Sequence, residues 1–213
     1  MHPETLEKDT ADVVSRLAKS QIVAPHSGIY LAGGTALALQ LGHRQSVDLD
    51  FFCEKGLPES ITESLTALGS LTVTRADPTT FDGTLDNVKV SFFSYTYPRL
   101  YPTLLFDGIA LADPRDIAAM KVLAISQRCT RKDFIDLYVL LRIYSLAEIF
   151  EFFDAKFKPV SYLRTHLLKS ITYFMEAETE PMPKMLEKIS WDEVKKKLVK
   201  DAETLAAQDL GNS

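Results

Sequence analysis

A pair of glycines followed by two closely spaced aspartates constrains this chain more than any other feature. Asp48 and Asp50 stand on either side of Leu49, fourteen residues after Gly34. In a β-strand alternate side chains share a face, so both carboxylates are expected to point the same way, roughly 6.5 Å apart. Such a pair can hold a magnesium ion against a phosphate, and glycine lets a backbone approach that phosphate without a Cβ atom in the way. The spacing therefore predicts a metal-binding strand beside a phosphate-binding turn.

The elements around this motif follow from local patterns. Residues 28–32 predict a strand that ends at the glycine pair, and residues 35–42 predict a short helix closed by Gly42. Residues 46–53 predict a second strand. Its apolar members, Val47, Leu49, Phe51 and Phe52, predict burial on both faces. Because a buried carboxylate without a cation is costly, a metal site is favoured over two solvated acids.

The rest of the chain separates into a mixed part and a helical part. Apolar spacing predicts helices over residues 4–19 and 58–68, and strands over 70–75, 81–85 and 87–93. From Asp113 onward the pattern is helical. We therefore expect an α+β fold with an α/β part at residues 1–112 and a helical part at residues 113–213.

Bulk properties exclude several classes of protein. No apolar run approaches the ~18 residues of a membrane span. The polar N-terminus and two distant cysteines, Cys53 and Cys129, fit a reduced cytoplasm rather than secretion. The net charge of −5 disfavours general, charge-driven binding of nucleic acid. Local basic patches remain open, either around Arg128, Arg131 and Lys132 or along the run 195–197, which we interpret as a solvated helix face.

Two stretches of the sequence resemble a known family. They are GGTALALQLGHRQSVDLDFF and LADPRDIAAMKVLAISQRCTRKDFIDLYVLL, and together they span about residues 28 to 142. Both are similar to the AbiEii-like nucleotidyltransferases, which are toxins of abortive-infection, type IV toxin–antitoxin systems. The resemblance implies the nucleotidyltransferase fold of the DNA polymerase β type: a mixed sheet with flanking helices, then a helical part that completes the active-site cleft.

The resemblance also implies a chemistry and partners. A nucleoside triphosphate would bind with magnesium (or manganese), and its nucleotidyl group would pass to a hydroxyl of RNA, with the end of a tRNA as one candidate, or of a protein. A cognate antitoxin would be a further partner. The implied catalytic residues are Asp48, Asp50, Lys121 and Asp136, the first two as metal ligands. The resemblance implies that Gly33, Gly34, Thr35 and Lys121 bind the nucleotide. Further nucleotide-binding candidates, taken from the residues themselves, are Arg44, Ser46, Lys132 and Asp133, although Arg44 could equally pair with an acid.

Several of these residues also have simpler interpretations. Thr35 can cap its helix, Lys121 can extend from an apolar helix face to water, and Asp133 fits a capping box that starts at Thr130. Asp136 can form an ion pair between helices with Lys121 or a neighbouring cation, or it can orient or deprotonate the attacking hydroxyl.

One position departs from the family's pattern. A third carboxylate is expected on the strand around residues 88–92, but Ser91 stands where it would be, and Asp86 lies at an awkward spacing. Three outcomes follow: a single metal ion, recruitment of Asp136 as the third acid, or a module that binds nucleotide without rapid transfer. A protein without nucleotide, whose aspartates merely pair with Arg44 and Lys121, is the remaining alternative.

Overall fold

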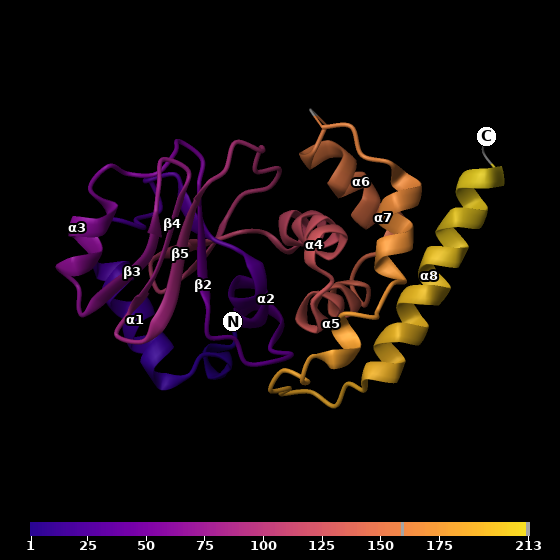
Figure 1. Ribbon diagram of the computed structural model, residues 1–213, viewed down its shortest axis with the longest axis horizontal. Coiled ribbons are helices and arrows are strands. Elements are labelled where there is room, and N and C mark those ends of the chain that lie inside the picture. The colour runs from indigo at the N-terminus through magenta and orange to yellow at the C-terminus, as the bar shows by residue number, and fades with distance from the viewer. Residues whose placement is uncertain (159, 212–213) are drawn as a thin grey trace. The chain divides into compact units, whose positions relative to one another are not determined.

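The computed structural model describes residues 1–158 and 160–211, with side chains to residue 209. The chain forms two compact units, Met1–Asp113 and Pro114–Ser213, which we call the N-terminal and C-terminal units (Figure 1). The N-terminal unit contains the sheet, and the C-terminal unit is helical.

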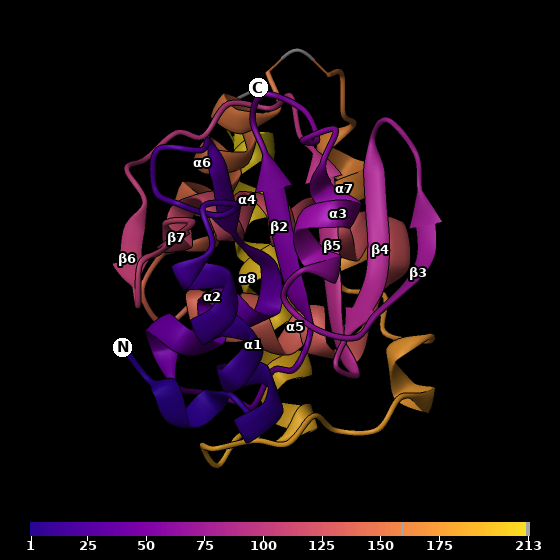
Figure 2. The ribbon, with the colours of Figure 1, turned by 90° about the vertical axis from the view of Figure 1, so that its left-hand side faces the viewer.

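Within the described residues, the N-terminal unit is built on one seven-stranded mixed sheet in the order β3-β4-β5-β2-β1-β7-β6 (Figure 2). Its strands are β1 (Ile29–Leu31), β2 (Leu49–Cys53), β3 (Leu71–Ala76), β4 (Thr80–Leu85), β5 (Val88–Ser94), β6 (Leu104–Phe106) and β7 (Ile109–Leu111). β2 pairs in parallel with β5 and antiparallel with β1, whereas β4 pairs antiparallel with β5. The site-bearing strand β2 is therefore central in the sheet.

Helices cover one face of this sheet. A short 3-10 turn (Pro3–Thr5) precedes α1 (Lys8–Lys19), and α2 (Gly33–Leu41) and α3 (Ile61–Thr66) follow. α1 and α3 lie on the same side of the sheet in both views (Figures 1 and 2). α1 buries Thr10, Val13, Val14 and Leu17, which recur every three to four residues as an amphipathic helix requires.

The two faces of β2 differ. Leu49, Phe51 and Cys53 are buried, and the Phe51 ring stacks on Phe92 of β5 with centroids 4.8 Å apart. Asp50 and Phe52 lie on the other face and are half-buried. The prediction of a strand buried on both faces is therefore wrong, and the alternation of β2 reflects one packed face and one partly open face.

The start of β2 also differs from the prediction. The strand begins at Leu49 instead of residue 46, and Val47 is 44% exposed. β1 has only three residues, so its ladder with β2 ends at Leu31 and Phe51. The backbone N–H of Ser46 instead donates to Thr5, and the backbone carbonyl of Asp48 accepts from the Thr35 side chain. Asp48 thus precedes the strand, and the expected spacing of two acids within one ladder does not apply.

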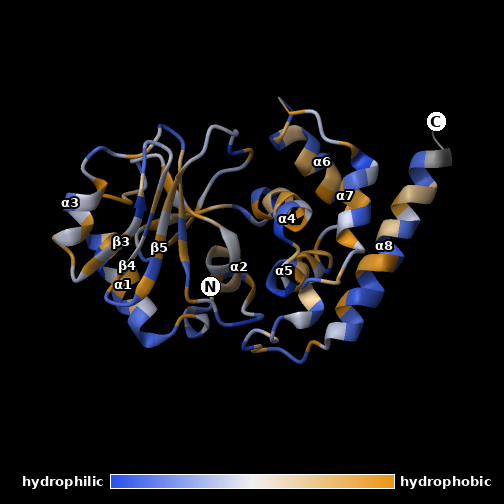
Figure 3. Ribbon diagram, in the orientation of Figure 1, coloured by the Kyte–Doolittle hydropathy of each residue, from blue (hydrophilic) through white to orange (hydrophobic). Residues whose placement is uncertain are grey.

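The C-terminal unit is a set of helices packed around α4. Its helices are α4 (Pro114–Arg128), α5 (Arg131–Leu140), α6 (Leu146–Lys156), α7 (Arg164–Ile171) and α8 (Trp191–Gly211). α4 contacts α5, α6 and α7, which explains why apolar residues surround most of it. α8 alternates polar and apolar segments and buries Val194, Leu198, Ala202 and Leu205 on one side (Figure 3). Among the described helices, none combines the length and apolar character needed to cross a bilayer.

Candidate active site

The glycine turn and an aspartate of β2 lie against each other. α2 begins at Gly33, whose φ of +67° is a conformation that favours glycine. The backbone N–H of Ala32 donates to the Asp50 carbonyl at 3.0 Å. A Cβ atom on Gly33 would stand 3.2 Å from Oδ2 of Asp50. The Asp50 carboxylate is therefore held at the N-terminal end of α2, where backbone N–H groups and the helix dipole favour anions and the ions that accompany them.

Thr35 holds the segment that carries the other aspartate. Its side chain is 2% exposed, and its hydroxyl donates to the backbone carbonyl of Asp48. The hydroxyls of Thr35 and Ser46 lie 2.8 Å apart. Because Thr35 has a single proton and a carbonyl can only accept, Ser46 is the donor in that pair. Neither hydrogen bond caps α2, since both join Thr35 to residues 46–48. The structure thus places Thr35 and Ser46 as groups that position Asp48, which is half-buried.

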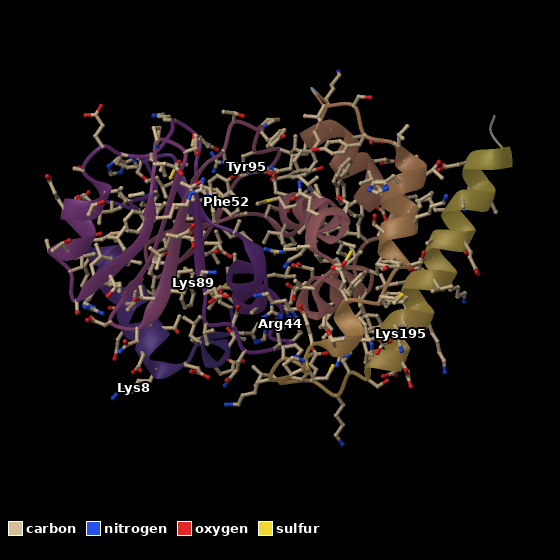
Figure 4. All side chains as sticks on the ribbon, viewed as in Figure 1. Lys8, Arg44, Phe52, Lys89, Tyr95 and Lys195 are labelled. Atoms are coloured by element: carbon tan, nitrogen blue, oxygen red, sulfur yellow. The ribbon has the colours of Figure 1, made fainter. Side chains whose placement is uncertain are left out.

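The link between α2 and this segment is largely buried. Gly42 ends α2 at a φ of +71°, as predicted, since glycine adopts the left-handed conformation readily. Arg44, two residues after it (Figure 4), is only 3% exposed, and its Nη1 donates to the Gln45 carbonyl at 3.0 Å. The backbone N–H of Ser46 donates to the Thr5 carbonyl at 3.0 Å. These contacts fix the path of the chain into Asp48.

On the open face of the sheet, the position expected to hold a third acid has an unexpected neighbour. Ser91 of β5 is in register with Asp50 of β2 on one side and with Asp82 of β4 on the other. Asp82 was not among the residues singled out from the sequence. The signal was present, because Thr80, Asp82 and Thr84 alternate with apolar residues along β4, but only the strand register places Asp82 beside Ser91.

Asp86 does not supply the third acid. It lies in the turn between β4 and β5 with a φ of +48°. Its Oδ2 pairs with Nη1 of Arg16 at 2.6 Å, and its Oδ1 accepts from the backbone N–H of Ser70 at 2.9 Å. These two contacts hold the pKa of the Asp86 carboxyl below its usual value, with the hydrogen bond from Ser70 as the larger cause. Asp86 therefore joins the turn to neighbouring elements.

In the C-terminal unit, Lys121 lies between two aspartates. Its Nζ is 2.7 Å from Oδ1 of Asp133 and 2.6 Å from Oδ2 of Asp136, and all three residues are at most 3% exposed. Arg128 adds a second cation, with Nε 2.7 Å from Oδ2 of Asp133. Burial alone would raise the pKa of the Asp133 carboxyl, but Lys121 and Arg128 outweigh burial and hold that pKa well below its usual range. The inter-helix ion pair weighed for Asp136 is thus present, and Lys121 does not extend to water.

The capping box expected at the start of α5 does not form. The Thr130 side chain makes no hydrogen bond to the helix backbone and instead donates to Oδ2 of Asp133. Asp133 is completely buried, whereas a capping-box acid bonds back to the backbone from the surface. Asp133 therefore forms ion pairs with Lys121 and Arg128 instead of capping the helix. Lys132, the residue before it, is exposed.

The predicted basic patches contain acids as well. Lys195 (Figure 4) lies 2.7 Å from Oε1 of Glu178 and 3.3 Å from Oδ1 of Asp192. Lys197 pairs with Asp201, and Arg131 lies over the Trp191 ring. The helix-face interpretation of residues 195–197 agrees with these pairs, because a surface that tracks a nucleic-acid backbone needs uncompensated positive charge.

The residues around Asp50 suit a magnesium ion. Among the described residues, no group of three or more His, Cys, Asp or Glu side chains is placed to hold an ion by itself. Magnesium is usually bound by one or two carboxylates together with substrate phosphates and water. Asp50 at the glycine turn and Asp48 on the segment beside it are such a set, and the absence of a side chain at Gly33 lets the Asp50 carboxylate lie against the turn.

The chain resembles known proteins over most of its length. The family model described as "Nucleotidyl transferase AbiEii toxin, Type IV TA system" matches residues 17–210. A protein of Aquifex aeolicus (strain VF5) is 36% identical over 182 residues, which cover 82% of this chain and 86% of that protein.

Solved structures share the fold. The nucleotidyltransferase toxin MenT4 from Mycobacterium tuberculosis H37Rv matches with a TM-score of 0.58 at 13% identity, over 94% of this chain and 86% of that chain. A protein of H. pylori assigned as a nucleotidyltransferase matches with a TM-score of 0.56 at 15% identity, over 97% of this chain and 99% of that chain. The predicted α+β fold of the polymerase β type is confirmed. The chain belongs to the AbiEii nucleotidyltransferase toxin family.

Proposed function

We propose that this protein binds a nucleoside triphosphate together with Mg²⁺ (or Mn²⁺) and transfers its nucleotidyl group to a hydroxyl. The observation that carries this proposal is the Asp50 carboxylate held against Gly33 at the start of α2. Asp48 and Asp50 would hold the ion, and the first N–H groups of α2 would bind phosphate oxygens. The ion would supply positive charge to the triphosphate.

The transfer is a substitution at the α-phosphorus. A bond forms between the acceptor oxygen and that phosphorus, the bond to the bridging oxygen breaks, and pyrophosphate leaves with the electron pair. The acceptor hydroxyl loses its proton, for which Asp136 is our candidate acceptor. Lys121 is the proposed cation that offsets charge on the triphosphate. Catalysis would rest on positioning and electrostatics, as in other phosphoryl transfers.

We propose RNA as the acceptor, with the end of a tRNA as the first candidate. The AbiEii family is a toxin family of type IV toxin–antitoxin systems, and on that basis a cognate antitoxin is the proposed protein partner. Expression of the chain alone should arrest growth, and a neighbouring gene product should relieve the arrest. If the Asp48→Asn/Asp50→Asn variant still arrests growth, the arrest does not depend on the proposed metal ligands and therefore not on nucleotidyl transfer.

The central test is a labelling reaction. The purified protein is incubated with each α-labelled nucleoside triphosphate, Mg²⁺ and total RNA or protein extract. We expect label in RNA with the wild type and none with Asp48→Asn/Asp50→Asn. Asp107→Asn is the matched control, since Asp107 is an exposed acid in the β6–β7 turn whose φ of +47° asparagine also adopts. Equal labelling by the double variant would overturn the proposal, and label in protein alone would change the acceptor.

A second candidate is a module that binds nucleotide without transferring it. Ser91 favours this reading, because a serine is a weak metal ligand and not a base at neutral pH. Calorimetry separates the two candidates. Mg²⁺-dependent binding of a triphosphate, without pyrophosphate release in the presence of any acceptor, would identify the module.

A further inference from the structure

Three polar residues form a row across the open face of the sheet. Asp50 of β2 is in register with Ser91 of β5, and Ser91 is in register with Asp82 of β4. Side chains in register on neighbouring strands share a face of the sheet and stand roughly perpendicular to it. We call these three residues the acidic row. The open face therefore presents carboxylate, hydroxyl and carboxylate in that order.

The hydroxyl in the middle of the row lacks a partner. Ser91 is 1% exposed, and its Oγ makes no hydrogen bond with any residue that the structure describes. An unsatisfied buried polar group costs about 1–3 kcal/mol, so such atoms are uncommon in folded proteins unless something else binds them. A hydroxyl flanked by two carboxylates suits an ion or ion-bound water. Ser91 thus points to a ligand in the row.

The carboxylate at the far end of the row is also uncompensated. Asp82 is half-buried, and in the described part of the chain its carboxylate forms no hydrogen bond or ion pair. Arg75 of β3 is the residue in register with Asp82, but its Nε lies 2.6 Å from Oδ2 of Asp77. Arg75, the cation directly across from Asp82 on β3, is therefore engaged with Asp77 instead.

The width of the row indicates how many ions it can hold. Asp50 and Asp82 are separated by two inter-strand spacings, about 9.5 Å. One magnesium ion bound between two oxygens spans only about 4 Å, because each Mg–O distance is about 2.1 Å. Two ions about 3.5–4 Å apart, each with an outer oxygen ligand, span about 8 Å. The strand spacing between Asp50 and Asp82 thus suits two ions better than one.

We propose that Asp82 is the carboxylate ligand of a second divalent cation, which binds on the opposite side of Ser91 from the Asp50 ion. This inference rests on the proposed function, since the triphosphate would complete both sites. The family's pattern expects a carboxylate at position 91, where this chain has a serine. Asp82, on the neighbouring strand β4, would supply that negative charge instead. The Ser91 hydroxyl would donate to a water or phosphate oxygen between the two ions.

Electron paramagnetic resonance of Mn²⁺ tests the inference without relying on activity. The wild type is titrated with Mn²⁺ in the presence of a triphosphate that has a methylene group between the α- and β-phosphorus atoms. We expect two Mn²⁺ ions per chain with a spin–spin coupling between them. Asp82→Asn should retain one uncoupled ion and the triphosphate, with affinity for the second ion lowered at least about 10–100-fold.

Two further variants make the result decisive. Asp107→Asn removes the same charge from an exposed turn outside the row and should leave both ions in place. Asp82→Asn/Ser91→Asp returns a carboxylate to the row and should restore the coupled pair. Two coupled ions in Asp82→Asn would overturn the inference, as would a wild type that binds the analogue with a single ion, although the proposed function would survive both results. A wild type that binds no analogue at all would overturn the proposed function as well.

Discussion

The Oδ2 atom of Asp50 lies 3.2 Å from the point that a Cβ atom on Gly33 would occupy. The acid and the turn therefore depend on each other: glycine at position 33 allows the left-handed backbone conformation and leaves space for the carboxylate. The backbone conformation of Gly33 is thus linked to the position of a proposed metal ligand. Adding one methyl group at residue 33 tests that link.

Gly33→Ala should lower both stability and metal affinity. An alanine at a φ of +67° costs about 1–2 kcal/mol, and its Cβ would push the Asp50 carboxylate away. Burial raises the pKa of the Cys53 thiol in β2 to about 12, so thiol labelling in a Cys129→Ser background reports opening of the N-terminal unit. We expect faster labelling of Cys53 and weaker Mn²⁺ binding.

Gly34→Ala is the matched control for that experiment. Gly34 is inside α2 and is not among the glycines with positive φ, so alanine there should maintain or raise stability. Equal acceleration of Cys53 labelling in both variants would contradict the role given to the contact between Gly33 and Asp50.

Thr35→Val should loosen the segment that carries Asp48. The substitution removes the hydrogen bonds to the Asp48 carbonyl and the Ser46 hydroxyl, and we expect a loss of about 1–2 kcal/mol in the free energy of unfolding. Thr35→Ser retains the hydroxyl and should behave nearly like the wild type. If Thr35 instead contacts phosphate directly, Thr35→Val would weaken triphosphate binding while leaving stability unchanged.

Lys121→Met should destabilise the C-terminal unit regardless of any catalytic role. It leaves the buried carboxylate of Asp136 without this ammonium, at an expected cost of about 3–5 kcal/mol. Trp191, the chain's single tryptophan, reports unfolding of this unit by fluorescence in urea. Lys121→Met/Asp136→Asn removes one charge of each sign and should recover part of the loss. Failure of the double variant to recover stability would contradict the assigned pair, and its transfer activity would measure catalysis separately from folding.

Asp133 should contribute stability that depends on pH. Its pKa is lower in the folded protein than the usual value of about 3.9, so the unfolded chain binds the proton more tightly. The contribution is therefore complete above that ordinary value and is lost as the pH falls toward the folded-state pKa. The difference in unfolding free energy between the wild type and Asp133→Asn, about 3–5 kcal/mol, should be constant from about pH 7 to 5 and shrink below about pH 4. A difference that grows in acid would contradict this assignment.

Local patterns in the sequence were sufficient for much of the fold. Alternation identified β3, β4 and β5, and Gly42 marked the end of α2 because no other residue adopts that conformation so readily. Patterns failed for the two short strands that no glycine pair marks, whereas β1, equally short, was marked by the glycine pair after it. β6 and β7 have three residues each and carry no alternation long enough to recognise, so their hairpin was not predicted.

The candidate site was harder to read because its geometry depends on pairing over long distances in sequence. Nothing local indicates that β2 pairs in parallel with β5, and that pairing alone brings Ser91 and Asp82 into line with Asp50. Likewise, Lys121 and its two aspartates are recognisable as charged residues in apolar helices, but their contact requires the packing of α4 on α5. The sequence therefore indicated which residue types matter, but the residues that each one contacts follow only from the strand register and the helix packing.

The parallel pairing of β2 with β5 also bears on how this chain is made. A ribosome synthesises Asp48 and Asp50 well before β4 and β5, and β2 cannot complete its pairing with β5 until Ser94 has emerged. Before that moment the two acids have neither Ser91 nor Asp82 beside them. A fragment of this chain that ends before β5 would lack the assembled row, so the proposed second ion site can form only after translation has passed Ser94.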